Sequence, residues 1–72
     1  MGKLRLEGYA FEYRWASDVA YDGIRLEVLT DQGNVLFDVS TPEVGSITVN
    51  TFGKEVAADL ILAALEIAQR PR

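Results

Sequence analysis

The stretch that decides the fold is residues 52–70, FGKEVAADLILAALEIAQR. Between Val56 and Ala68 the apolar residues recur at helical spacing, so at roughly 100° per residue they share about half of a helix surface. Five alanines in this window also favour a helix. We expect Thr51 or Gly53 to be the N-cap and Pro71 to end the helix. The sequence therefore predicts one amphipathic helix, whose apolar side is expected to pack against a sheet.

The residues before this helix predict the sheet, because apolar and polar side chains alternate along four segments. The predicted strands are residues 3–15, 24–28, 35–39 and 46–50. Short connections between them favour a sequential antiparallel meander. The expected fold class is α+β, with a four-stranded antiparallel meander covered on one face by a single C-terminal helix (ββββα, two layers).

The first predicted strand changes its apolar phase at Gly8. Leu4 and Leu6 occupy even positions, whereas an aromatic row occupies odd positions. This row consists of Tyr9, Phe11, Tyr13 and Trp15. A strand cannot change its buried face without a break in register. We expect either a β-bulge at Gly8 in one long bent strand, or a separate surface for the two leucines, such as a partner strand.

Parity fixes the pairing of the next two strands. The apolar residues of the two strands share a face only if the numbers of each residue pair add up to an odd number. This condition requires a loop with an even number of residues. The turn-forming sequence DQGN supplies a four-residue loop at 31–34. This loop pairs Val28 with Phe37 and Leu26 with Val39.

The predicted core contains five helix and ten strand residues. From the helix come Val56, Leu60, Ile61, Ala64 and Ile67; from the sheet come Phe11, Tyr13, Ile24, Leu26, Val28, Val35, Phe37, Val39, Ile47 and Val49.

Composition limits the partners and the location. Eleven acidic and seven basic residues give a net charge of −4, which disfavours binding to nucleic-acid phosphates. There is no cysteine for a disulfide or a thiolate metal site. No apolar run approaches the roughly 18 residues that span a membrane. We expect one cytoplasmic domain over residues 1–72, with no nucleic-acid or membrane partner.

Catalytic and cofactor motifs are missing from the sequence. Without histidine the usual group for proton transfer near neutral pH is absent, and no serine has a histidine base. Asp18 and Asp22 resemble only a fragment of a calcium loop. Gly53 and Lys54 lack the remainder of a phosphate-binding loop. We therefore expect no enzyme activity, no metal and no cofactor.

Our leading hypothesis is a protein-interaction or assembly module that self-associates, most simply as a homodimer, because the edge strands of a meander invite pairing. The expected contact residues are Leu4, Leu6, Tyr9, Trp15, Leu62 and Leu65. An alternative is a small acidic inhibitor, of the antitoxin or immunity type, that binds a basic protein through Glu12, Glu27 and Asp38. A third hypothesis is a small-molecule pocket between the aromatic row and the helix.

Overall fold

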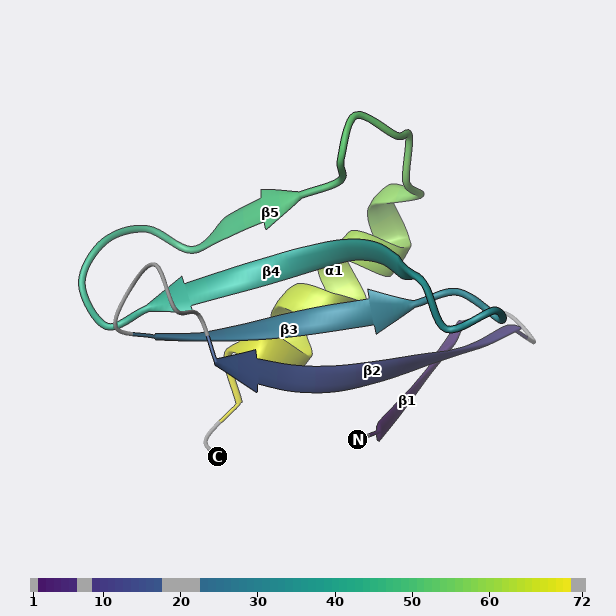
Figure 1. Cartoon of the computed structure of the whole chain (residues 1–72), viewed down its shortest axis with the longest axis horizontal. Coiled ribbons are helices and arrows are strands. Elements are labelled where there is room, and N and C mark those ends of the chain that lie inside the picture. The colour runs from purple at the N-terminus through teal and green to yellow at the C-terminus, as the bar shows by residue number, and fades with distance from the viewer. Residues whose placement is uncertain (1, 7–8, 18–22, 71–72) are drawn as a thin grey trace.

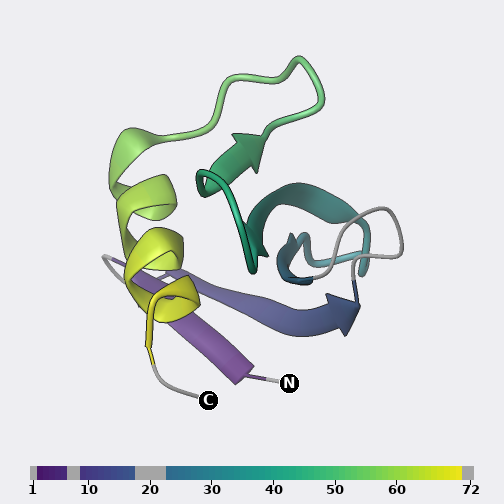
Figure 2. The same ribbon diagram turned by 90° about the vertical axis from the view of Figure 1, so that its left-hand side faces the viewer.

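The computed structural model describes residues 2–6, 9–17 and 23–70, and for Tyr9 it describes the backbone alone. In chain order the elements are β1 (Gly2–Leu6), β2 (Tyr9–Ser17), β3 (Gly23–Leu29), β4 (Val35–Pro42), β5 (Thr48–Asn50) and α1 (Ala58–Ala68). The strands form one antiparallel sheet in the order β1-β2-β3-β4-β5, with α1 behind it (Figure 1). The twisted sheet curves partly around the helix (Figure 2). The predicted fold class, an antiparallel meander under one C-terminal helix, is confirmed, with five strands.

The extra strand comes from the segment that was predicted as one long strand. β1 and β2 are separate antiparallel strands, in which Leu4 pairs with Phe11 and Leu6 with Tyr9. These residue numbers add up to an odd value, so Leu4 and Leu6 lie on the same face as the described aromatic side chains Phe11, Tyr13 and Trp15. The single bent strand was therefore wrong, and the phase change marks a hairpin. The bulge expected at Gly8 lies outside the described residues.

The β3–β4 pairing is confirmed, because Val28 lies opposite Phe37 and Leu26 opposite Val39. The loop differs from the prediction. The Thr30 N–H donates to the Asn34 carbonyl at 2.8 Å, which encloses a three-residue loop. The register then shifts by one residue, since Leu29 pairs with Val35. This β-bulge makes up for the odd loop and preserves the parity that the buried face requires.

The helix begins later than the sequence predicts. Ala57 is the N-cap, without a side-chain hydrogen bond. Thr51 and Gly53 belong instead to a turn, in which the Lys54 N–H donates to the Thr51 carbonyl at 3.1 Å. Phe52 has a φ of +56° and Gly53 a φ of +76°. These left-handed values are incompatible with a right-handed helix. The expected stop at Pro71 lies outside the described residues.

The core lies between α1 and the concave face of the sheet, and α1 packs against β1, β3 and β4. Its buried members are Leu4, Leu26, Val28, Phe37, Val39, Leu60, Ala64, Ile67 and Ala68. Leu4 is an addition to the predicted core, whereas Ile47 was wrongly placed there because it is 39% exposed. Within the described part of the chain, no helix combines the length and the apolar character needed to cross a bilayer.

Candidate interaction surface

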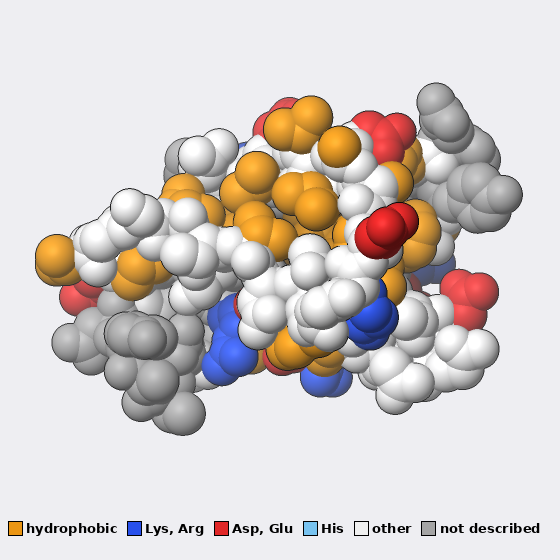
Figure 3. All heavy atoms as spheres, turned by 90° about the horizontal axis from the view of Figure 1, so that it is seen from above, with side chains coloured by type: hydrophobic (Ala, Val, Ile, Leu, Met, Phe, Trp, Pro, Cys, Tyr) orange, Lys and Arg blue, Asp and Glu red, His pale blue; other side chains and the backbone are white. Residues whose placement is uncertain are grey.

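Among the described residues, four large apolar side chains are exposed, and three of them flank β5. The four are Val44, Ile47, Phe52 and Leu62, with exposures of 90, 39, 51 and 65%. Only Leu62 lies on α1, and the other three flank β5 within nine residues of sequence. We refer to β5 with Val44, Ile47 and Phe52 as the β5 edge surface. Figure 3 views the molecule from the side on which β5 lies, and hydrophobic side chains form a patch across the middle of this view.

The two edges of the sheet differ in charge and cover. β1 carries the exposed Lys3 and Arg5, and α1 packs against it. Charged side chains and a covering element both protect a strand edge from unwanted pairing. β5 has the sequence TVN, without a charge, and lies beyond the strands that α1 contacts. Of the two described edges, β5 is therefore the one suited to pairing with another strand.

A hollow of about 270 Å³ opens beside the start of β5. Its lining residues are Ser40, Pro42, Val44, Gly45, Ser46 and Thr48. Ser40 pairs with Thr48, whereas the neighbouring Val39–Val49 pair faces the core. Because successive strand residues point to opposite faces, the hollow lies on the outer face, which we define as the sheet face away from α1. The exposed Val44 lies at its rim.

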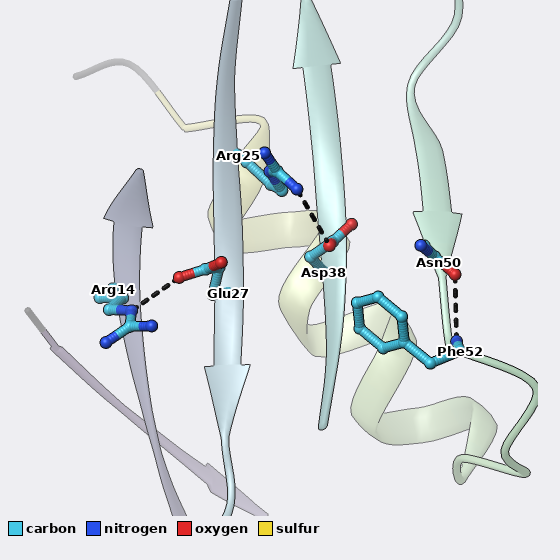
Figure 4. A network of polar contacts seen from close by, with 6 residues as sticks. All are labelled: Arg14, Arg25, Glu27, Asp38, Asn50 and Phe52. Atoms are coloured by element: carbon cyan, nitrogen blue, oxygen red, sulfur yellow. Dashed lines mark hydrogen bonds and ion pairs between the residues drawn. The ribbon is translucent and has the colours of Figure 1, made fainter. Parts of the chain in front are cut away.

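Phe52 lies beyond the other end of β5, in an unusual backbone conformation. Its φ of +56° is one that bulky residues rarely adopt. The Asn50 side-chain oxygen accepts the Phe52 N–H at 3.0 Å and so helps to hold the turn. In Figure 4 the Phe52 ring extends over the outer face toward Asp38. Strained conformations of this kind cost about 1–3 kcal/mol and are concentrated at functional positions.

The outer face carries two ion pairs beside this surface (Figure 4). Arg14 Nε lies 2.6 Å from Glu27, and Arg25 Nη1 lies 3.7 Å from Asp38. Glu27 and Asp38 are opposite each other on β3 and β4, an arrangement that like charges make unfavourable unless each is compensated. The hypothesis of a basic partner was based on three carboxylates. Two of them, Glu27 and Asp38, thus already pair with an arginine of the same chain. Glu12 remains exposed.

The six expected contact residues do not form one exposed group. Leu4 is buried at 3% exposure and contributes to the core, so its position needs no partner strand. Leu6, Trp15 and Leu65 are partly buried and pack against the same core. Of the five whose side chains the structure describes, Leu62 alone is well exposed. The side chain of Tyr9 lies outside the described residues.

Sequence reasoning missed the β5 edge surface for local reasons. Phe52 was assigned to the helix and Ile47 to the core, and Val44 belonged to none of the predicted strands. Two signals were available in the sequence. One is the isolated Val44 between Glu43 and Gly45, a segment with no other apolar residue to bury it. The other is Phe52 directly before Gly53, since a glycine at that place allows a left-handed turn.

A larger open cavity of about 680 Å³ lies where the end of α1 meets β3 and the β4–β5 connection. Its lining residues are Gly23, Ile24, Thr41, Pro42, Glu43, Gly45, Ile47, Ala68, Gln69 and Arg70. Neither this cavity nor the hollow is lined by Phe11, Tyr13 or Trp15, so both differ in place from the predicted small-molecule pocket. Asp18 and Asp22, the fragment of a calcium loop, lie outside the described residues.

Two further findings concern metals and relatives. Among residues 2–6, 9–17 and 23–70, no three histidine, cysteine, aspartate or glutamate residues form a group that is able to hold a metal ion. Comparisons with known proteins find no matching family model, no similar curated protein and no similar solved structure.

Proposed function

We propose that this chain is a small non-enzymatic protein-interaction domain that self-associates. The observation that carries the proposal is the concentration of exposed apolar residues along an uncharged edge strand. Val44, Ile47 and Phe52 are all exposed, and no charged residue lies between Ser46 and Gly53. Apolar side chains around a free strand edge are typical of surfaces that pair with another strand.

The size of the domain supports the same proposal. A chain of 72 residues buries a smaller share of its surface than a larger domain does, so it retains more apolar area. Covering Phe52 and its neighbours with a second molecule removes apolar area from water, at about 25 cal/mol per Å². The lack of histidine and cysteine favours a binding role over catalysis.

The test is the molar mass in solution, measured by light scattering from low to high micromolar protein concentration. We expect the mass to rise from that of one chain to that of two. A mass of one chain throughout this range would overturn the proposal.

Salt separates self-association from the binding of a basic partner. Each copy carries a net charge of −4, so two copies repel each other and added salt screens that repulsion. We expect the dimer to be as stable or more stable at high salt. A complex with a basic protein would instead weaken as salt is added, because opposite charges steer it.

A further inference from the structure

We infer that two copies pair through antiparallel β5 strands centred on Val49, with Phe52 of each copy entering the hollow of the other. This inference rests on the proposed self-association and specifies its surface and geometry. It makes the assembly a symmetric dimer, in which the same contact occurs twice. The sheet then continues from one copy into the next.

The register follows from the positions of the residues along β5. When Val49 lies opposite its own copy, paired residue numbers add up to 98, and Thr48 pairs with Asn50 of the second copy. Ser46, which lines the hollow, and Phe52 each lie two residues beyond opposite ends of β5, so this pairing brings Phe52 of one copy to the end of β5 at which the hollow of the other opens. Phe52 and the hollow lie at opposite ends of β5, so only an antiparallel arrangement brings them together twice.

The faces of the two sheets also match. A twofold axis perpendicular to a sheet leaves its outer face on the same side in both copies. The hollow opens on the outer face, and the Phe52 ring extends over the outer face as well (Figure 4). The ring lies toward Asp38 in the single chain and turns about its side-chain bonds to reach the second copy. Such rotamer changes are common at interfaces.

The hollow is large enough for the ring. Its volume is about 270 Å³, whereas an apolar cavity of about 150 Å³ is sufficient to bind benzene. Pro42 and the exposed Val44 supply apolar contacts in its lining. An aromatic side chain buried in a pocket is the usual form of a residue that dominates binding energy.

A second copy fits this surface better than an unrelated strand does. One chain carries the strand edge, the Phe52 ring and the hollow. A single twofold contact between two copies therefore pairs both edges and places each ring in a hollow. The pattern of β5 is also self-complementary, because Val49 meets Val49 on the inner face and Thr48 meets Asn50 on the outer face. β5 itself brings no like charges together. An interface without like charges favours self-association, because the chain as a whole is acidic and two copies repel each other.

The first experiment compares Phe52→Asn with Leu62→Asn by sedimentation velocity. Phe52→Asn removes the ring and leaves Asn-Gly, the pair best suited to a turn with two positive φ values, so the fold is retained. We expect it to raise the dimer dissociation constant by about tenfold or more, because the symmetric dimer loses two rings. Leu62→Asn alters an exposed apolar residue on α1 and should leave the constant unchanged.

The outcomes separate this inference from the proposed function. If wild-type chains dimerise and Phe52→Asn dimerises equally well, the β5 geometry is wrong and self-association stands. A dimer lost only in Leu62→Asn would likewise overturn the geometry and place the contact on α1. If the wild-type chain stays monomeric, both proposals fail.

A second experiment tests the reciprocal contact. Phe52→Lys and Val44→Asp should each remove the dimer, because each places a charge in both contacts. Mixing the two variants creates one Lys–Asp contact and restores one wild-type Phe52–Val44 contact. We therefore expect the mixture to dimerise at least about tenfold more tightly than either variant alone. A mixture that stays monomeric while wild-type chains dimerise would overturn the reciprocal contact.

Discussion

Leu4 lies directly opposite Phe11 in the β1–β2 pair, and both side chains contribute to the core beneath α1. The core thereby joins the first strand of the chain to its last element, because α1 packs against β1 as well as against β3 and β4. Leu4 is therefore a structural residue of the single chain.

Replacing Leu4 with alanine should lower the free energy of unfolding by about 2–5 kcal/mol, the usual cost of truncating a buried leucine. The reason is its exposure of only 3%. Urea unfolding followed by circular dichroism measures the change. Leu62→Ala is the matched control, since Leu62 is 65% exposed and should change stability by less than about 0.5 kcal/mol. Equal effects of the two substitutions would contradict the burial of Leu4.

The second prediction concerns backbone strain in the turn before α1. Phe52→Asn and Phe52→Ala both remove the ring, but asparagine tolerates a φ of +56° better than alanine does. We expect the asparagine variant to be more stable than the alanine variant by about 0.5–1 kcal/mol. Thermal unfolding of the two variants side by side measures the difference. An alanine variant that is the more stable of the two would mean that Phe52 does not adopt the left-handed conformation.

The ion pair between Arg25 and Asp38 makes a third prediction. Asp38 is a buried carboxylate at 4% exposure, and Arg25 Nη1 lies 3.7 Å from it. Replacing Arg25 with methionine keeps an unbranched side chain but removes the compensating charge, and we expect it to lower stability by about 1–3 kcal/mol. Chemical denaturation provides the measurement.

Arg70→Met is the control for that substitution. Arg70 pairs with Glu66 at 3.5 Å, but both side chains are largely exposed. Exposed pairs of this kind contribute little, so the control should have an unfolding midpoint close to that of the wild-type chain. A larger loss from Arg70→Met than from Arg25→Met would contradict the stabilising role of the Arg25–Asp38 pair.

Deleting residues 54–72 should abolish cooperative folding. These residues contain α1, whose Leu60, Ala64, Ile67 and Ala68 form one side of the core. Without them the concave face of the sheet is exposed to water, and an open apolar sheet aggregates. Solubility and thermal unfolding of the truncated chain test this directly. A soluble fragment with a sharp melting transition would show that the sheet is stable without the helix.

The periodicity of residues 56–68 was sufficient to predict α1 and its buried side, and parity was sufficient to predict the pairing of Leu26 and Val28 across β3 and β4. The same parity rule explains Leu4 and Phe11 once a hairpin is allowed between them. The start of α1 was not predictable in this way, because the positive φ of Phe52 conflicts with the ordinary preference of phenylalanine.

The sequence alone determined the α+β class, the antiparallel order and the apolar face of the helix, because all three depend on local periodicity and short connections. Tertiary structure decided which apolar residues remain exposed. Ile47 alternates with Val49 as a buried strand residue would, but α1 packs over β1, β3 and β4 and leaves the start of β5 uncovered. Burial depends on which element packs over a residue in space. The alternation of residues along a strand does not show how far the helix extends over the sheet.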